Sequence, residues 1–339
     1  MNPLNRRQFA LAAAATPLAA CQSQPEPTPI PSYTPPASQA TWRSTPDAPY
    51  AVQEIYPALY RGGIWIAGGF SPQALGATER VIVYDIDAGV WRDGPALPTP
   101  SHHVQLAALN DELWAIGGYV GGDTRMRWIC TPRVLKLDGD RWVEAPALPK
   151  PVAEGMPLAH QGRIHLIGGR SPRGSANAEW NDQGDIEDHF VITPGAQAWT
   201  RAAPLPMARN SHAGAAWGDA LHIISGRTVA NGQAPAHHIY DINTDIWRNG
   251  SDFPEPRGGI AGAVWRGRVV AGGGEIFEPG SVGDGLYAFD DANGWSRIET
   301  LPTARHGHGL VAAGDALYAL GGAMRPSGNG TLASVDVLS

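Results

Sequence analysis

The chain has 339 residues, with 25 Lys or Arg and 32 Asp or Glu, so its formal net charge is −7. This acidic balance, without any run of basic residues, argues against a nucleic-acid partner and against electrostatic binding to anionic lipid. The two cysteines, Cys21 and Cys130, are too few for a disulfide framework.

Residues 1–21 have the pattern of a targeting segment. Arg6 and Arg7 precede an apolar stretch, 10–20, which is too short to span a bilayer and ends in the sequence LAAC at Cys21. The arginine pair resembles a twin-arginine export signal, and the ending resembles the lipobox of bacterial lipoproteins. These resemblances imply cleavage before Cys21 and lipidation of that residue. Because the next residue is not acidic, we expect the periplasmic face of the outer membrane.

Residues 22–40 have the composition of a linker. Six of these nineteen residues are Pro, which disfavours a packed core and favours an extended spacer of up to about 55 Å at roughly 3.1 Å per residue. We therefore expect one folded domain, 41–339, held away from a membrane on this linker.

A cassette of about fifty residues repeats along 41–339. Its first half is a strand, a tight turn and a second strand that ends in a glycine pair, and its second half is a strand, a Trp and a Leu-Pro. A period of 40–50 residues with four short strands indicates a propeller blade. The repeated tryptophans are spaced by 51, 57, 48 and 48 residues and are Trp91, Trp142, Trp199, Trp247 and Trp295.

The number of blades follows from the glycine pairs, of which there are six. Only five Trp-Pro strands follow them, but Trp42 and Pro49 have the same offset of seven as Trp91 and Pro98. The N-terminal segment should therefore supply the outer strand of the last blade, which removes a free sheet edge. The prediction is an all-β, six-bladed propeller closed by its N-terminal strand. The pairs begin at Gly68, Gly117, Gly168, Ser225, Gly273 and Gly321.

The strand-Gly-Gly and Trp-x₆-Pro pattern resembles the kelch repeat over nearly all of 41–339. The resemblance implies a six-bladed kelch propeller of the superfamily that includes the galactose oxidase central domain and N-acetylneuraminate epimerase. In such a repeat the glycines allow close backbone approach, and the Trp packs between blades. We therefore assign no chemistry to the repeated tryptophans or to Trp42.

Loop length indicates which face of the propeller carries function. The turns between the first and second strands of each blade (A and B) are minimal, whereas the loops between the second and third strands (B and C) reach about 19 residues in blade 3. Long loops in a compact repeat are usually functional. The face with the B–C loops and the connections from strand D to the next strand A is the candidate binding face.

Aligning the blades on the glycine pair places charged residues at this rim. The residue after the pair is Phe70, Tyr119, Arg170, Arg227, Glu275 and Ala323. Fourteen positions before the pair, the residue is Glu54, His103, Glu154, Ser211, Gly259 and Gly307. We expect the first three of these to form one arc of the rim. The opposite arc would carry an arginine from each of blades 4, 5 and 6, namely Arg209, Arg257 and Arg305.

Two interpretations of these charges stay open. Arg170 and Arg227 could clamp a carboxylate, because guanidinium matches its geometry, or the rim arginines could brace neighbouring blades. Two further tryptophans of the long loops could stack on sugar rings or simply pin their loops. The candidate catalytic residues are Glu154 and Glu275, and the candidate ligand-binding residues are Arg170, Arg227, Glu54, His103, Tyr119, Trp128 and Trp180.

The histidines do not form a recognisable metal site. His102-His103 and His237-His238 are pairs, but no carboxylate or Cys completes a ligand set at fixed spacing. Galactose oxidase holds copper with a Tyr joined to a Cys, whereas the loop of Cys130 lacks a Tyr-His pair. We expect no metal and no cofactor, and no P-loop, dinucleotide or nucleophile-elbow motif is present.

The expected function is a membrane-anchored, cell-envelope binding module rather than an enzyme, with an envelope protein, a glycan or a sugar acid as its partner. The alternative is a sugar-acid isomerase similar to N-acetylneuraminate epimerase, whose rim has a Glu after a strand-Gly pattern and an Arg a few residues on. Here Glu275 follows Gly274, but the next residues, IFEPGSVGDG, contain no Arg. The resemblance would make Glu275 or Glu154 the acid or base, with Arg170 or Arg227 as the clamp.

Overall fold

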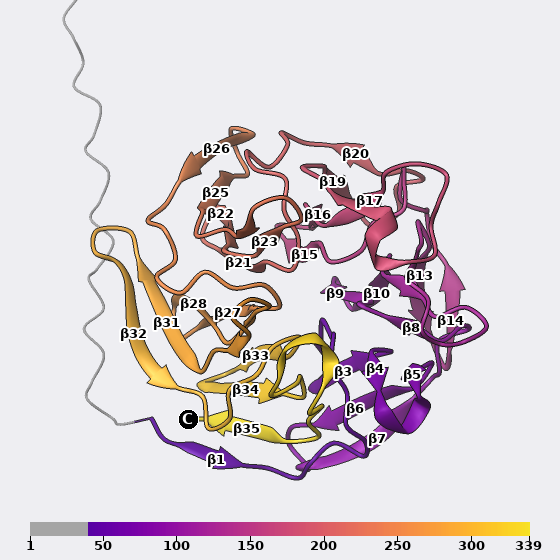
Figure 1. Ribbon diagram of the computed structural model, residues 1–339, viewed down its shortest axis with the longest axis horizontal. Helices are drawn as coiled ribbons and strands as arrows, with labels where there is room; N and C mark the ends of the chain where they lie inside the picture. Colours follow the sequence, from indigo (N-terminus) through magenta and orange to yellow (C-terminus); the bar gives the residue numbers. More distant parts are fainter. Residues whose placement is uncertain (1–39) are drawn as a thin grey trace, which may run out of the picture. The chain divides into compact units, whose positions relative to one another are not determined.

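The computed structural model describes residues 40–339. The predictions for the export segment, for Cys21 and for the linker up to residue 39 lie outside the described residues. The described residues form six four-stranded antiparallel sheets arranged in a ring, with three short 3₁₀ turns and no α-helix among them (Figure 1). No helix in this part of the chain has the length and hydropathy needed to cross a bilayer.

Each sheet is one blade, with strands A to D running from the centre outward. Blade 1 contains β2 (Ala58–Tyr60), β3 (Gly63–Ala67), β6 (Val81–Asp85) and β7 (Val90–Gly94), and blade 2 contains β9 (Gln105–Leu109), β10 (Glu112–Ile116), β13 (Val134–Asp138) and β14 (Arg141–Glu144). Blade 3 contains β15 (Met156–His160), β16 (Arg163–Ile167), β19 (His189–Ile192) and β20 (Thr200–Arg201), and blade 4 contains β21 (Ala213–Trp217), β22 (Ala220–Ile224), β25 (His237–Asp241) and β26 (Ile246–Asn249). Blade 5 contains β27 (Ala261–Trp265), β28 (Arg268–Gly272), β31 (Gly285–Asp290) and β32 (Gly294–Thr300).

Blade 6 closes the ring with strands from both ends of the described chain. β33 (Gly309–Ala313), β34 (Ala316–Leu320) and β35 (Val335–Leu338) are followed in the sheet by β1 (Trp42–Ser44). β1 pairs antiparallel with β35, with Trp42 opposite Leu338, and lies at the outer edge of the blade in Figure 1. The predicted fold, including closure by the N-terminal strand, is confirmed.

The repeated tryptophans join each blade to the one before it. Every indole N–H except that of Trp42 donates a hydrogen bond of 2.8–3.0 Å to the backbone carbonyl four residues after the Trp of the preceding blade. The pairs are Trp91 with Pro46, Trp142 with Pro95, Trp199 with Pro146, Trp247 with Ala203, and Trp295 with Ser251. The structural role predicted for these residues is confirmed.

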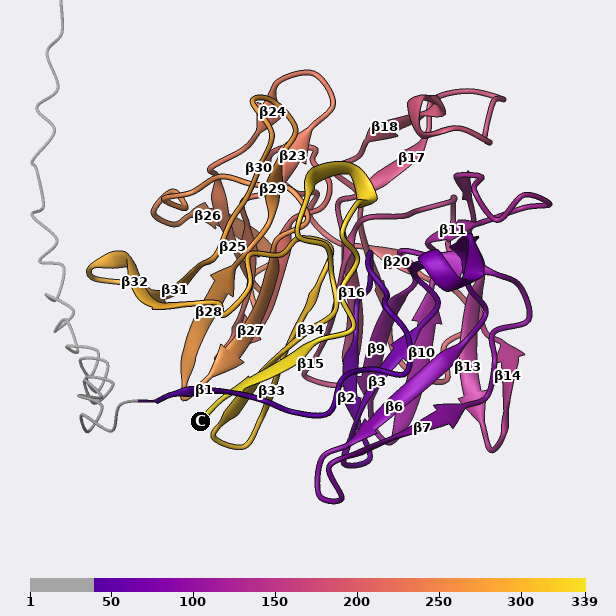
Figure 2. The same ribbon diagram turned by 60° about the horizontal axis from the view of Figure 1, so that its bottom comes forward.

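Short hairpins rise from one face of the ring, beyond the glycine pairs (Figure 2). They place the long B–C loops around the mouth of the central channel on that face. The paired strands are β4 (Phe70–Ser71) with β5 (Gly76–Ala77), β11 (Tyr119–Val120) with β12 (Ile129–Cys130) and β8 (Ser101–His102), β17 (Arg170–Pro172) with β18 (Gln183–Asp185), β23 (Arg227–Thr228) with β24 (Gly232–Gln233), and β29 (Glu275–Ile276) with β30 (Ser281–Val282). The 3₁₀ turns, η1 (Pro72–Ala74), η2 (Trp180–Asp182) and η3 (Pro326–Gly328), belong to the same loops.

Candidate functional site

The two aligned sequence columns are neighbours in every blade. The residue just before the inner column forms a β-bridge with the residue just after the glycine pair, as with Gln53 and Phe70 in blade 1. The other pairs are His102 with Tyr119, Ala153 with Arg170, Asn210 with Arg227, Gly258 with Glu275, and His306 with Ala323. In each blade the repeat therefore places the residues of both columns side by side, at the same end of the channel.

The inner column adopts a left-handed backbone in all six blades, with φ of 56° at Glu54, 53° at His103 and 55° at Glu154. This conformation favours glycine, and blades 5 and 6 indeed have Gly259 and Gly307 there. A larger residue costs about 1–2 kcal/mol at such a position. Neighbouring members are linked through the backbone, since the N–H of His103 donates to the carbonyl of Glu54 at 3.1 Å.

Glu154 is the centre of a buried charge cluster. Its Oε1 atom accepts from the Tyr119 hydroxyl at 2.9 Å, its Oε2 atom accepts from the Ser211 hydroxyl at 2.5 Å, and both Arg170 and Arg227 lie within 3.6 Å. Burial alone would raise the pKa of Glu154, but the charges of Arg170, His103 and Arg227 and the Ser211 hydroxyl outweigh burial and lower it to about 2. The carboxylate of Glu154 is therefore ionised, and a protein hydroxyl donates to each of its two oxygens.

Arg227 joins Glu154 to a second carboxylate, that of Glu275. Its Nη1 atom donates to Glu275 Oε1 at 2.8 Å, its Nε atom donates to Asn210 Oδ1 at 3.2 Å, and its guanidinium lies over the Phe277 ring at 4.4 Å. The other oxygen of Glu275 accepts from the backbone N–H of Ser327 at 3.1 Å. Glu275 is thus held from both sides and is almost completely buried.

Arg170 does not face the channel mouth, although its sequence position is equivalent to that of Arg227. It is completely buried, lies under the Trp180 ring at 3.9 Å and donates to the carbonyls of Trp180 and Gln183 at 3.0 Å. These bonds tie Arg170 to the blade 3 loop. The clamp expected from two arginines therefore has one accessible member, Arg227.

The expected arc of three rim arginines is corrected by the structure. Arg209 is buried and donates to the carbonyls of Ser225 and Ile223 within its own blade. Arg305 is buried in blade 6, where its Nη2 atom lies 2.5 Å from Asp336. Because strand carbonyls and a carboxylate inside the blade satisfy these guanidinium groups, both side chains point away from the channel and brace their blades. Arg257 is half-buried and donates to Ser281 at 3.1 Å.

Glu54 is the most exposed of the three rim carboxylates, with 15% of its side chain accessible. Its Oε2 atom lies 3.0 Å from Nε2 of His103, and its Oε1 atom lies 3.7 Å from Nδ1 of His306. Burial would raise the pKa of Glu54, but the charge of His103 and its hydrogen bond outweigh burial and hold the pKa below its usual range. Glu54 therefore presents a carboxylate at the channel mouth.

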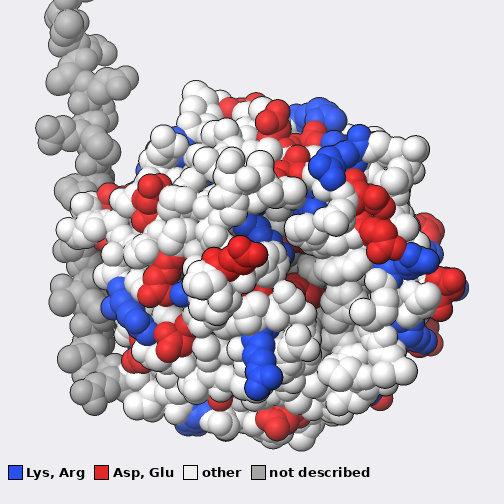
Figure 3. Space-filling view, in the orientation of Figure 1, with Lys and Arg blue, Asp and Glu red and all other residues white. Residues whose placement is uncertain are grey.

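These side chains form the base of a cavity of about 870 Å³ on the loop face. Figure 3 shows this face, with a hollow near its middle. Glu54, His103, Arg227 and Glu275 line the cavity together with Trp128 and Trp180, so the structure brings six of the predicted residues together. Tyr119, Glu154 and Arg170 are buried and support it from beneath, through their bonds to one another.

Most of the apolar part of the site could not be found from the sequence columns, although Phe70 stands in one of them. Phe70, Phe277 and Met126 line the cavity, and the residues from Ser327 to Thr331 close its blade 6 side. The sequence does contain a signal for this part of the site, because the B–C loops of five blades each carry one exposed apolar residue. We call this set the apolar crown, and its exposed fractions are 80% for Leu75, 56% for Met126, 42% for Val229, 39% for Phe277 and 48% for Met324.

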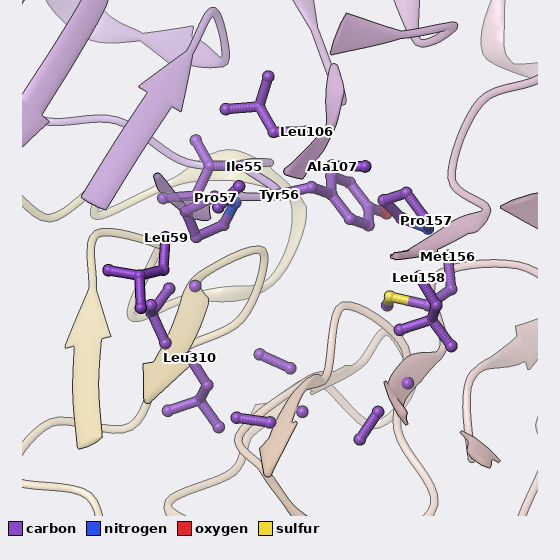
Figure 4. Close-up of a pocket in the computed structure, with 18 of the residues that line it drawn as sticks. Ile55, Tyr56, Pro57, Leu59, Leu106, Ala107, Met156, Pro157, Leu158 and Leu310 are labelled. Carbon is purple, nitrogen blue, oxygen red and sulfur yellow. The ribbon is translucent and has the colours of Figure 1, made fainter. Parts of the chain in front are cut away.

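A second, smaller cavity of about 350 Å³ lies in the channel between the innermost strands. Its walls are mainly apolar, with Leu106 from blade 2, Met156 and Leu158 from blade 3 and Leu310 from blade 6. Tyr56 extends across it toward Pro157 (Figure 4). Burial, followed by the charges of Glu154 and Glu54, raises the pKa of Tyr56 well above its usual value. The channel is therefore apolar on one side of Glu54, and charge gathers on the loop side.

The buried histidines pair with one another in strands rather than around a shared centre. His165 lies 2.8 Å from His189, and His222 lies 2.9 Å from His237. Between residues 40 and 339, no group of three or more His, Cys, Asp or Glu side chains has a geometry that could hold a metal ion. Cys130 is buried, and burial raises the pKa of its thiol.

Comparisons with known proteins agree with this architecture, although no family model matches the chain. It is 26% identical to human Kelch-like protein 34 over 230 residues, covering 64% of this chain and 34% of that protein, and 27% identical to alpha-scruin of Limulus polyphemus over 212 residues, covering 59% and 22%. It is 23% identical to Kelch-like protein 23 of Pongo abelii over 277 residues, covering 80% and 46%. Residues 40–339 form a kelch-type β-propeller.

A solved structure titled "Structure of YjhT" has the same fold as this kelch propeller. The TM-score is 0.71 at 16% identity, over 87% of this chain and 96% of that one. At this identity the likeness concerns the fold alone. The curated relatives are longer proteins, and the chain spans less than half the length of those named above.

Proposed function

We propose that the chain is a membrane-anchored kelch propeller of the cell envelope that binds a protein partner through its B–C/D–A loop face. The observation that carries this proposal is the apolar crown, of which Leu75, Met126 and Phe277 line the 870 Å³ cavity. Protein interfaces combine apolar side chains at the centre with polar groups that fix orientation. Here the crown supplies the apolar side chains, and the charged base of the cavity supplies the polar groups.

The distribution of exposed apolar side chains supports the choice of face. Ten large apolar side chains are exposed in residues 40–339, and five of them belong to the crown. The remaining five lie outside the B–C loops, and two of them, Val90 and Ile246, begin β7 and β26 next to turns on the opposite face. Isolated exposed apolar residues are normal on any surface, whereas three that line one cavity indicate a binding site.

The comparisons support a binding module more than the sugar-acid isomerase alternative. The named relatives are kelch proteins, and none of their printed names describes an isomerase. The two candidate catalytic carboxylates also have their oxygens committed to protein donors, Glu154 to Tyr119 and Ser211, and Glu275 to Arg227 and Ser327. A general acid or base must be able to reach the proton that it transfers.

The envelope location is proposed from the N-terminal sequence alone. Arg6, Arg7 and the LAAC sequence at Cys21 support export followed by lipidation. Metabolic labelling with a fatty acid tests the anchor, because Cys21→Ser should abolish the label. Label that persists in this variant would refute lipidation at Cys21 without bearing on the loop face.

Affinity purification of the full chain from its own cells, quantified by mass spectrometry, tests the binding face. The native chain should retain a partner that the double variant Leu75→Ser/Met126→Ser loses. The control is Val90→Ser/Ile246→Ser, which removes comparable exposed apolar surface from the opposite face. Equal retention by both double variants would contradict the proposed face.

A further inference from the structure

We propose that the cavity receives a cationic hydrogen-bond donor, an alkylammonium or a guanidinium group, and that the Oε1 atom of Glu54 accepts from it. This inference rests on the proposed function for the identity of the binding face and adds the chemical class that the face selects. It differs from the carboxylate clamp that the sequence suggested, because the open position at the base of the cavity is an acceptor.

The hydrogen bonds at the base of the cavity leave one carboxylate oxygen without a protein donor. Both oxygens of Glu154 and both oxygens of Glu275 accept from protein groups. Glu54 differs, because only its Oε2 atom has a partner within hydrogen-bond distance, namely His103. Glu54 is also the most accessible of the three carboxylates. A ligand therefore meets an unpaired acceptor there.

The protons on two adjacent histidines keep Glu54 oriented and ionised. His102 Nε2 lies 3.0 Å from the carbonyl of Arg127, so this nitrogen carries a proton, and burial lowers the pKa of His102 well below its usual value. The Nδ1 atom of neutral His102 therefore accepts from Nδ1 of His103 at 2.8 Å. His103 then directs its remaining nitrogen, Nε2, at Glu54 Oε2 across 3.0 Å, and, against the effect of burial, this contact holds the pKa of Glu54 below its usual range.

A buried histidine nitrogen beside Glu54 also lacks a hydrogen-bond partner. His306 Nε2 lies 2.9 Å from the carbonyl of Arg325 and therefore carries a proton, so the remaining ring nitrogen is Nδ1. This atom is buried without a hydrogen bond, 3.7 Å from Glu54 Oε1 and 3.5 Å from Glu275 Oε2. Glu54 Oε1 therefore has no protein donor within hydrogen-bond distance, and a cationic donor in the cavity would supply one.

The cavity walls suit the body of such a ligand. Phe70, Trp128 and Phe277 line the cavity above Glu54, and aromatic faces attract cations that also contact a carboxylate. Arg227 does not compete for an anionic ligand on equal terms, because it already lies between Glu154 and Glu275 and over the Phe277 ring. Aromatic walls and an open carboxylate oxygen together favour a cation.

Three probes of the same shape and different charge test this selection on the full chain. Ligand-detected NMR titrations at pH 8 would compare benzylammonium, benzyl alcohol and benzoate. We expect benzylammonium to bind most tightly and benzoate most weakly. Tightest binding of benzoate, or equal affinity for the three probes, would overturn the proposal using the native chain alone.

A matched pair of variants assigns the preference to one oxygen. Glu54→Gln should weaken benzylammonium binding about tenfold or more, the effect of losing one charged hydrogen bond, and leave benzyl alcohol unchanged. Glu278→Gln removes the same charge from an exposed position in the blade 5 loop and should keep the native preference. A preference that survives Glu54→Gln contradicts the proposal. Should Glu54→Gln not fold, Phe277→Ala should weaken binding of all three probes, and unchanged binding would refute the assignment to this cavity.

The source of the cation is decided by competition against benzylammonium. Displacement by Nα-acetyl-lysinamide or Nα-acetyl-argininamide would indicate a basic side chain of a protein partner, and displacement by putrescine alone would indicate a free amine. Failure of every cation to bind would overturn this inference. It would leave the proposed function intact, because the crown variants measure partner retention independently of Glu54.

Discussion

Arg209, Arg257 and Arg305 occupy equivalent positions in blades 4, 5 and 6 but have different surroundings. Arg209 and Arg305 are fully buried, and each donates to backbone carbonyls of buried residues, one within a strand and one just after it. Arg305 also neutralises the buried carboxylate of Asp336. Arg257 keeps part of its side chain exposed and donates to a single hydroxyl, that of Ser281. Arginines at equivalent sequence positions therefore differ in how many buried acceptors depend on them.

This difference predicts unequal costs for the same substitution. Arg209→Ala and Arg305→Ala should each lower the free energy of unfolding by about 3 kcal/mol or more, because buried acceptors lose their donors. Arg257→Ala should cost about 1 kcal/mol, the net value of one ordinary hydrogen bond. Urea denaturation of the three variants measures these values. Equal losses at the three positions would show that the braces do not act as described.

At this scale the sequence alignment identified the right positions but not the direction of the side chains. Arg170 and Arg227 both follow a glycine pair, and nothing in the repeat distinguishes them. Arg170 is buried because η2 brings Trp180 over it, whereas Arg227 faces the cavity beside Phe277. The paths of the long loops decide this, and those paths have no period that a sequence could reveal.

Blades 3 and 4 share an element that the other blades lack, a histidine pair between strands B and C. His165 on β16 contacts His189 on β19, and His222 on β22 contacts His237 on β25. Burial is the main cause that lowers the pKa of each ring, to about 3 for His165 and about 4 for His189 and His222. The folded protein therefore keeps these rings neutral at pH values where the unfolded chain would protonate them.

The expected consequence is a loss of stability in mild acid. The folded pKa values lie below the unfolded value of about 6.5, so the unfolded state binds more protons between about pH 6.5 and pH 4, and stability falls as pH falls through that window. Thermal melts from pH 7.5 to 4.5 should show a decreasing Tm. The double variant His222→Leu/His237→Leu should flatten this dependence, and an unchanged slope would exclude this pair as a cause.

The closing strand gives a prediction for blade 6. Deleting residues 22–40 should leave Tm nearly unchanged, because the pairing of β1 with β35 stays intact. Deleting residues 22–50 removes that pairing together with the buried side chains of Ala48 and Tyr50, and exposes an edge strand. The second deletion should lower Tm strongly. Equal melting temperatures for the two deletion variants would contradict closure by β1.

Elements could be predicted well where the repeat fixes them and poorly where it does not. The glycine pairs and Trp-Pro strands located all six blades and the closing strand, because each blade needs the same close approach and the same contact between neighbours. Trp91 and its equivalents show this, since their acceptors recur four residues after the preceding Trp. The histidine pairs occur in two blades only, so they do not form a repeated column and could not be predicted from the alignment of the blades.

For the whole molecule, the two ends of the propeller differ in chemistry. The loop end combines the apolar crown with a charged base formed by Glu54, Arg227 and Glu275. The channel behind it is mainly apolar and ends in minimal turns. Loop length predicted which face holds the larger of the two cavities described above, and the aligned columns predicted several residues of its charged base. The apolar crown was not predicted from the sequence, because its residues belong to loops of different lengths that cannot be aligned with one another.

Site-specific photo-cross-linking in the cells that produce the protein tests the claim that the loop face binds a partner most directly. A photoreactive residue would replace Met126 or Met324 in the crown, and Trp217 or Ile246 away from it, all four positions being exposed. One discrete adduct is expected from both crown positions and none from Trp217 or Ile246. Adducts from Trp217 and Ile246 without any from the crown would contradict binding through the loop face.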